Sequence, residues 1–241
     1  MLGNWNSIAL WLSFAANDPV TATAPKPAPA PIVAPAPSTA ADEAVKKVQA
    51  FYQGTQKLKA DFKQTYTNAV FGRTSNSTGK LWVMKPGKMR WDYATPEKKH
   101  FISDGATLWI YEPAAKQAGR QDLKDTVLPV AVTFLYGQGE LARDFAASLD
   151  PGKYGGPKDI VVKLVPRAPT AQYKHLWLVL DPVDHHVKES IILEASDNVN
   201  HFKFYGLRQN DKVPVTDKHF KFVVPPGVKV VRPDEMTPAS R

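Results

Sequence analysis

The 241-residue sequence contains no cysteine, and this absence removes several classes of protein from consideration. Without thiols there is no structural disulfide, no thiolate metal site and no cysteine within these residues for lipid attachment. The absence is compatible with any compartment, including one outside the cytoplasm. An exported protein with this composition would fold without covalent bridges.

Long apolar runs and long basic runs are also missing. The apolar stretch Ile8–Ala16 has nine residues, whereas a membrane-spanning helix needs about 20. The net charge is +8, but the longest basic run is only Lys98-Lys99-His100. Such scattered charge does not predict a nucleic-acid site, although it is compatible with anionic membranes or acidic partners.

The common catalytic motifs are absent as well. The sequence has no G-x-S-x-G, G-x-G-x-x-G, P-loop or H-E-x-x-H pattern, and Ser103-Asp104-Gly105 is typical of a hairpin turn. We therefore predict that the protein is not an enzyme.

The densest polar cluster lies between Asp181 and Glu189. Its adjacent His185 and His186 would point to opposite faces of a strand, so they could not easily bind one metal ion. We predict an exposed hairpin turn here, with no metal and no cofactor. The alternative from a different class is an envelope hydrolase or metal protein that uses Asp184 with these two histidines.

The N-terminal residues are typical of an export signal followed by a spacer. Ile8–Ala16 has the length of a signal-peptide core, and Ser13–Ala15 is an acceptable cleavage site, although no Lys or Arg precedes them. The alternative is a disordered apolar tail. Pro19–Pro37 contains seven Pro and favours extended polyproline II. The predicted division is a signal sequence over 1–18, a Pro/Ala-rich linker over 19–41, one folded domain over 42–233 and a disordered tail over 234–241.

Hydrophobic periodicity predicts a helix followed by many strands. A variant capping box at Thr39–Asp42 starts a helix over Ala41–Leu58, which continues into a strand over Lys59–Ala69. Pro129–Leu135 predicts a short helix that is either a lid or a crossover packed on the sheet, and Glu140–Ser148 predicts further helical turns. Alternating segments predict strands at Lys80–Met84, Lys88–Tyr93, Thr107–Tyr111, Asp159–Pro166, Lys174–Leu180, Val187–Leu193, His201–Leu207 and Phe220–Val224.

About ten strands, with helices at one end and in one insertion, predict an α+β fold. Its antiparallel sheet would be strongly curved or form part of a barrel. Met89, Trp91 and Tyr93 would share one face of this sheet, and Arg90 and Asp92 the other. Three of the six Trp lie within 79–113. That much aromatic surface must be buried in a core or kept for an apolar ligand.

Several short motifs occur in the order found in one known family. They are Phe62 and Gln64, Gly79-Lys80-Leu81-Trp82, Lys85-Pro86, Arg90-Trp91, Pro96, the segment from Ser103 to Pro113, Leu141 to Phe145, and Phe220 to Val228. Over about residues 42–230 the chain therefore resembles the LolA family, the periplasmic carriers of outer-membrane lipoproteins in Gram-negative bacteria. The resemblance implies an unclosed antiparallel β-barrel of about ten or eleven strands. An N-terminal helix and short lid helices would cover an apolar cavity for lipoprotein acyl chains.

The resemblance also implies partners and a location. A family carrier takes a lipoprotein from an inner-membrane ABC transporter and passes it to the outer-membrane receptor LolB. We expect a periplasmic monomer that does this without nucleic acid and without enzymatic activity. The alternative is a related lipid or glycolipid carrier, or a receptor-like sensor domain of the same fold. LolB itself is disfavoured, because it requires an N-terminal lipidated cysteine.

The resemblance and the aromatic strands together predict a binding site. Lys85 stands where well-known members have an arginine that holds the lid through hydrogen bonds to backbone carbonyls. Lysine keeps the charge but loses the planar fork of donors, so it is either a weaker latch or an ordinary turn residue. The expected acyl-chain cavity is lined by Tyr52, Leu58, Phe62, Leu81, Val83, Met89, Trp91, Trp109, Tyr111, Val130, Phe134 and Leu135.

Overall fold

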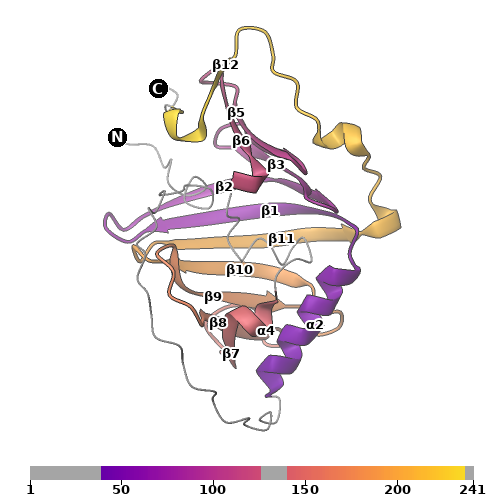
Figure 1. Cartoon of the computed structure of the whole chain (residues 1–241). Helices are drawn as coiled ribbons and strands as arrows, with labels where there is room; N and C mark the ends of the chain where they lie inside the picture. The colour runs from indigo at the N-terminus through magenta and orange to yellow at the C-terminus, as the bar shows by residue number, and fades with distance from the viewer. Residues whose placement is uncertain (1–38, 126–139, 237–241) are drawn as a thin grey trace, which may run out of the picture.

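A computed structural model describes residues 39–125 and 140–236 of the chain (Figure 1). Two helices precede or interrupt the strands: α2 spans Ala40–Gly54 and α4 spans Leu141–Asp144. The strands are β1 Lys57–Asn68, β2 Arg73–Met84, β3 Lys88–Thr95, β4 Lys99–Asp104, β5 Thr107–Glu112, β6 Gln117–Asp122, β7 Phe145–Leu149, β8 Ile160–Pro166, β9 Tyr173–Leu180, β10 Val187–Glu194, β11 Val199–Gln209 and β12 Lys229–Val231. Short 3-10 helices are η1 Leu123–Asp125, η3 Asn210–Lys212, η4 Asp217–Phe220 and η5 Pro233–Glu235.

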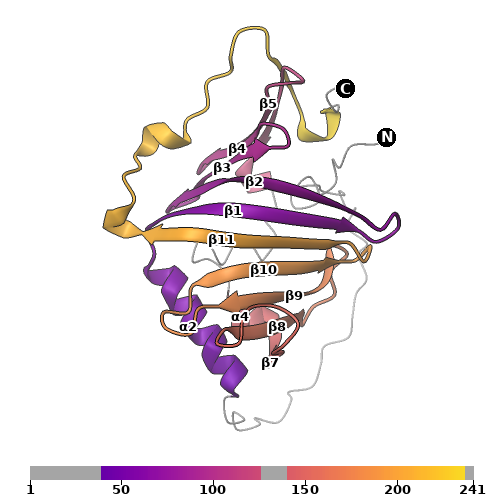
Figure 2. The same ribbon diagram turned by 180° about the vertical axis from the view of Figure 1, so that it is seen from behind.

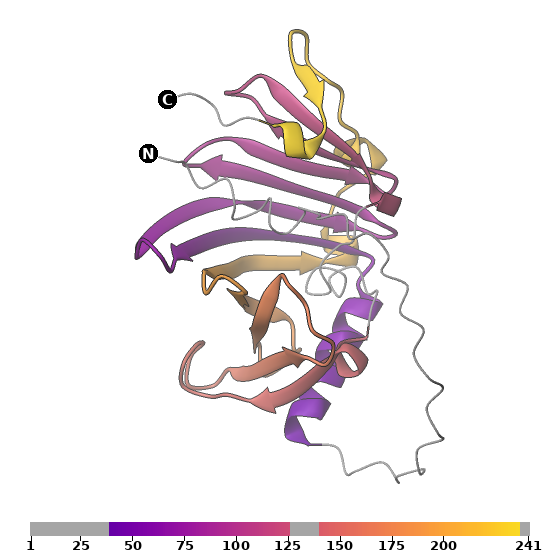
Figure 3. The same cartoon turned by 60° about the vertical axis from the view of Figure 1, so that its left-hand side comes forward.

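Within the described residues these twelve strands form one sheet in the order β12-β6-β5-β4-β3-β2-β1-β11-β10-β9-β8-β7. Neighbouring strands are antiparallel, except that β12 pairs with β6 in parallel. Because β12 and β7 lie at the two ends of this order, the sheet does not close on itself. Figure 3 shows that it curves strongly. The predicted α+β fold with an unclosed antiparallel sheet is confirmed, with one or two more strands than expected.

Helix α2 begins within one residue of the predicted position. Thr39 is its N-cap, and the Thr39 and Asp42 side chains each accept a hydrogen bond from the other residue's backbone N–H, so the predicted capping box is confirmed. The helix ends at Gly54 rather than at Leu58, because Leu58 already belongs to β1 and is buried against the sheet interior. Figures 1 and 2 show α2 running obliquely beside β7 to β10, and it contacts β7, β8 and α4.

Alternation along the strands gives the sheet two apolar faces. The inner face, together with α2 and α4, forms the main core, which includes Leu58, Leu81, Met89, Leu176 and Phe202. The outer face carries two smaller clusters. One surrounds Trp177 and is formed by Val161, Trp177, Val179 and Ile191, and the other is formed by Val213, Val215 and Phe220 packed on Trp82 and Met84.

Some of the predicted elements were wrong. Phe220–Val224 is not a strand: η4 ends at Phe220, and the residues after it have no regular secondary structure and do not pair into the sheet. Glu140–Ser148 is helical only over α4 and then forms β7. Strands β4 and β6 were not predicted, since β4 begins with charged residues and β6 consists of small, polar and charged residues.

The C-terminal residues cover the edge of the sheet at β6. After crossing the outer face, the chain adds β12 to β6, and Met236 then packs over Gly119 of β6. A Cβ atom on Gly119 would lie 2.6 Å from the Met236 sulfur, so the glycine makes this approach possible. Residues 234–236 therefore lie against the sheet, although the sequence assigned them to a disordered tail.

Candidate ligand-binding interior

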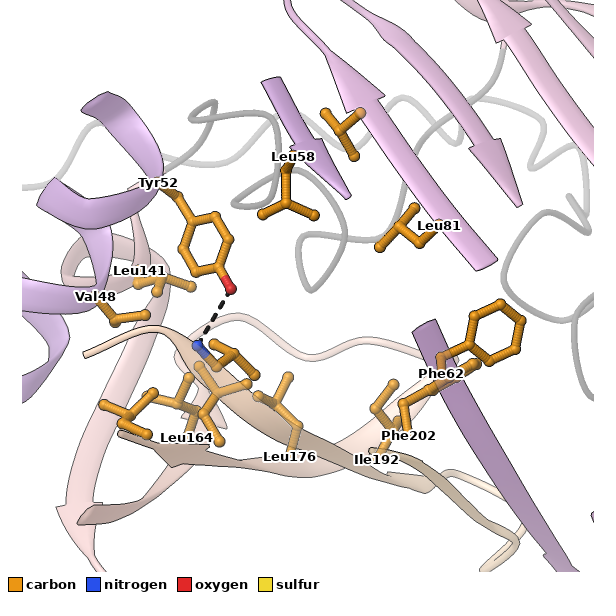
Figure 4. Close-up of a cluster of buried hydrophobic side chains, with 14 of the residues drawn as sticks. Val48, Tyr52, Leu58, Phe62, Leu81, Leu141, Leu164, Leu176, Ile192 and Phe202 are labelled. Atoms are coloured by element: carbon orange, nitrogen blue, oxygen red, sulfur yellow. Dashed lines mark hydrogen bonds between the residues drawn. The ribbon is translucent and has the colours of Figure 1, made fainter. Parts of the chain in front are cut away.

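Seven of the predicted cavity residues meet in the sheet interior. Figure 4 shows side chains from α2, α4, β1 and β2 and from β8 to β11 gathered around one region. The seven residues that the structure places in or against the main core are Tyr52, Leu58, Phe62, Leu81, Val83, Met89 and Trp91. All but Trp91 are at most 4% exposed. Any ligand that enters this interior must therefore displace side chains or move an element that covers them.

An aromatic cluster around Phe62 forms one part of this interior. The Phe62 ring centroid lies 4.8 Å from that of Tyr93, 5.1 Å from that of Trp91 and 5.9 Å from that of Phe202. Gly79 of β2 leaves room for the Phe62 ring, because a Cβ atom at this position would lie only 2.5 Å from the ring. As predicted, Met89, Trp91 and Tyr93 share the inner face of β3. On the outer face Arg90 and His100 both contact Asp92.

Tyr52 ties helix α2 across the interior to β10. Its phenol oxygen accepts a hydrogen bond of 3.2 Å from the backbone N–H of Val187, the first residue of β10 (Figure 4). Tyr52 is only 1% exposed, and burial raises the pKa of its phenol well above the ordinary value. The ring is therefore a neutral, apolar part of the interior, and its hydroxyl is anchored to β10.

The C-terminal end of α2 is held by the side chain of its C-cap residue Thr55 and by side chains from other elements. The last four carbonyls of a helix have no partner within it. Here Thr55 Oγ1 donates to the Phe51 carbonyl at 2.8 Å, and Asn210 Nδ2 donates to the Gly54 carbonyl at 3.4 Å. The Lys85 amine donates to the carbonyl of Tyr52 and, at 3.4 Å, to that of Gln53.

Lys85 also supplies a charge that α2 lacks. The last turn of α2 contains no basic residue, and a cation near the helix C-terminus is favourable because of the helix dipole. Partial burial lowers the pKa of the Lys85 amine. Lys85 thus donates to backbone carbonyls as a latch would, but within the described residues those carbonyls belong to α2 rather than to a separate lid.

Trp109 and Tyr111 are not on the inner face. Both rings pack against Phe222 of the C-terminal segment, with centroid distances of 5.2 and 5.1 Å. Their neighbours Leu108 and Ile110 belong to the main core instead. The prediction that placed Trp109 and Tyr111 in the cavity was therefore wrong. Every position of Thr107–Tyr111 after the first is apolar or aromatic, so the sequence pattern does not show which residues face inward. Val130, Phe134 and Leu135, with the predicted lid, lie outside the described residues.

The cluster predicted near Asp181 forms a turn. Ligand atoms of Asp181, Asp184 and His186 lie within 4.8 Å of one another, whereas His185 is not among them. The Asp181 carboxylate accepts a hydrogen bond of 2.8 Å from the backbone N–H of Val183, and Asp184 is paired with His186. Burial disfavours the charged form of Asp184, but the hydrogen bonds from His186 outweigh it and keep the pKa of this carboxyl below its ordinary value. These contacts account for the cluster by turn chemistry.

A second polar network lies at the opposite end of β10. The Glu194 carboxyl is 3% exposed, and Oε2 accepts from Asn198 Nδ2 at 3.1 Å and from the Tyr66 hydroxyl at 3.3 Å. Its Oε1 is buried and has no hydrogen-bond partner among the described residues. Burial accordingly raises the pKa of Glu194 above its ordinary value.

Replacing Glu194 by Gln should stabilise the fold at neutral pH. A carboxyl whose pKa is raised in the fold contributes stability below its unfolded pKa, and this contribution is lost as the pH rises through the folded pKa. In urea unfolding between pH 4 and 8, the midpoint of Glu194→Gln should therefore rise relative to that of the wild type as the pH increases. The control is Glu112→Gln: Glu112 is also buried but pairs with Lys99 at 2.5 Å, so its loss should destabilise. A Glu194→Gln protein that is less stable than the wild type at pH 8 would contradict this account.

No helix in residues 39–125 or 140–236 is both long and apolar enough to cross a membrane. The profile of the family described as "Outer membrane lipoprotein carrier protein LolA" matches residues 53–223. The chain belongs to the LolA family.

Two relatives of this LolA-family chain carry the name "Outer-membrane lipoprotein carrier protein". The one from Chromobacterium violaceum is 30% identical over 196 residues, which cover 81% of this chain and 90% of the relative. The one from Alkalilimnicola ehrlichii is 29% identical over 188 residues, which cover 75% and 80%. Among solved structures, an uncharacterized conserved protein from Thermus thermophilus has the same fold, with a TM-score of 0.51, 14% identity and coverage of 80% of this chain and 99% of that one.

Proposed function

We propose that this protein is a periplasmic carrier that shields lipoprotein acyl chains in the apolar interior between α2 and the inner face of the sheet. The observation that supports this most is the combination of LolA-family membership with an interior built from Leu58, Leu81, Met89 and Trp91. Burial of each acyl CH₂ group is worth about 0.8 kcal/mol, so a carrier needs an apolar interior but no catalytic group. We further propose that the donor is an inner-membrane ABC transporter and the acceptor a LolB-like receptor.

Helix α2 is the element that we propose to move when cargo enters. The interior is filled by its own side chains in this structure, so acyl chains need space that displacement of α2 would give. Among the described residues, the polar contacts of α2 include the Tyr52 bond to β10 and the bond from the Leu141 N–H to Gln49 Oε1 at 3.2 Å. At its C-terminal end they include the bonds from Lys85, Thr55 and Asn210. A carrier whose closed state is stabilised by a few such bonds can open for cargo and close again on release.

The proposed function predicts what is bound when the protein is isolated from native cells. Mass spectrometry of the copurified material should find N-terminally acylated lipoprotein peptides, because only the acyl chains need shielding from water. Glycolipid or phospholipid without lipoprotein peptides would instead favour the related lipid-carrier function. Matched isolation of Trp91→Asp serves as the control, since it should carry less of the same material.

A further inference from the structure

The tip of the β1–β2 hairpin exposes two adjacent apolar side chains. Val70 is 80% exposed and Phe71 is 74% exposed, at the far end of two twelve-residue strands. The hairpin is among the longest features of the sheet, and Figures 1 and 3 show its tip at the edge of the molecule. An exposed aromatic next to an exposed aliphatic residue indicates an interaction site more strongly than scattered single residues do.

The tip is held in place by hydrogen bonds. Asn68 Oδ1 accepts from the backbone N–H of Phe71 at 2.9 Å. On the neighbouring β10–β11 turn, Asn198 Oδ1 accepts from the backbone N–H of Ala69 at 3.0 Å, and Asn198 is itself fixed by the buried Glu194. Two side-chain contacts thus position residues 68–71 and leave Val70 and Phe71 in solvent.

The charge on the half of the hairpin next to the tip is positive. Residues 62–78 contain Lys63 and Arg73 and no Asp or Glu, and Arg73 lies two residues beyond Phe71. The stem next to the tip is uncharged and polar, with Thr67 paired to Thr74 at 3.2 Å. The neighbouring turn has one exposed carboxylate, Asp197, and it is paired with Lys174. No exposed, unpaired carboxylate in these described segments opposes an anionic surface.

We propose that the β1–β2 hairpin tip inserts Val70 and Phe71 into the interface of an anionic phospholipid membrane. Two residues on a narrow tip are too small for a stable protein interface, which buries about 1,000 Å² or more. A lipid interface accepts an apolar side chain without a shaped partner, and Arg73 adds attraction to anionic headgroups. The contact is weak and reversible, as expected for so little buried apolar surface. It does not depend on what the interior carries.

The absence of cysteine allows a direct test. In the full chain, Phe71→Cys is labelled with an environment-sensitive nitrobenzoxadiazole dye, and Val183→Cys is the matched control, because Val183 is 87% exposed on the β9–β10 turn. Vesicles of phosphatidylethanolamine and phosphatidylglycerol should shift the emission of the label at 71 to the blue and leave that at 183 unchanged. Vesicles of phosphatidylcholine alone should give a smaller shift at 71.

Vesicle flotation tests the same contact without a label. The double variant Val70→Ser/Phe71→Ser should reduce partition onto the anionic vesicles by about tenfold, whereas Val183→Ser/Val223→Ser should not. The apolar stretch Ile8–Ala16 is present in all variants and affects them equally. The proposal is overturned if the label at 71 does not shift with vesicles, if it shifts equally at 183, or if it shifts only when a purified membrane protein is present.

Discussion

Replacement of Trp91 by Asp should reduce the affinity for a fluorescent fatty acid by about 100-fold or more, which corresponds to roughly 2.7 kcal/mol. The indole packs against Phe62 and Phe202, with centroid distances of 5.1 and 5.5 Å, and its loss removes apolar surface that the acyl chain would contact. The new carboxylate would also have to be desolvated whenever an acyl chain lies beside it. Fluorescence titration measures the dissociation constant, and far-UV circular dichroism checks that the variant is folded.

Trp109→Asp is the matched control for this experiment. Trp109 of β5 is, like Trp91 of β3, a half-buried indole, but it lies on the outer face against Phe222 and beneath Arg120. A carboxylate there should disturb the C-terminal segment and leave fatty-acid binding within about threefold of the wild type, the usual scatter of such effects. Equal losses in both variants would indicate general destabilisation. Unchanged binding by Trp91→Asp would place the acyl chains elsewhere.

The two tryptophans also show where the sequence was informative. In β3 the residues Met89, Trp91 and Tyr93 alternate with charged Arg90 and Asp92, and only one face can be apolar, so the inner face follows from the pattern. In β5 both faces are apolar, because Trp109 and Tyr111 are covered by Phe222 from a distant part of the chain. No local pattern reveals a cover that arrives more than a hundred residues later.

The same reason explains the errors at the C-terminal end. The strand predicted over Phe220–Val224 does not form, because Phe220 ends η4 and packs with Val213 and Val215 on Trp82 and Met84 instead. Arg90 Nη1 fixes this segment by donating to the His219 carbonyl at 3.1 Å. The capping box of α2 was predictable because it is complete within four residues, whereas the end of α2 depends on Lys85 and Asn210, which lie far along the chain.

For Lys85, the family resemblance predicted the type of contact and the structure identifies the partners. The resemblance to the LolA family predicted a side chain that donates to backbone carbonyls, and the structure shows such donation to Tyr52 and Gln53. The expected lid residues lie outside the described part of the chain, so their contact with Lys85 stays a prediction. What the structure adds is that this cation neutralises the C-terminal end of a helix that has no basic residue in its last turn.

Replacement of Lys85 by Met should therefore leave cargo loading intact and impair transfer to the receptor. Methionine keeps an unbranched stem but removes the charge-assisted hydrogen bonds, which are worth about 1–3 kcal/mol. If these bonds form only when α2 is closed over an empty interior, their loss makes release less favourable and the cargo is held roughly 5- to 150-fold more tightly. Transfer of a radiolabelled lipoprotein to a purified LolB-like receptor measures this effect directly.

Two further substitutions separate a latch from an ordinary turn lysine. Lys85→Arg keeps the charge and adds donors, so transfer should remain at least at the wild-type level. Lys88→Met makes the same chemical change three residues away, where the amine pairs with Asp217 on the outer face and does not touch α2. Lys88→Met should transfer normally, because an exposed ion pair contributes about 0–1 kcal/mol to the fold and nothing to the closure of α2. Normal loading and normal transfer by Lys85→Met would show that the bonds to Tyr52 and Gln53 only shape the turn, and that closure is controlled by other contacts.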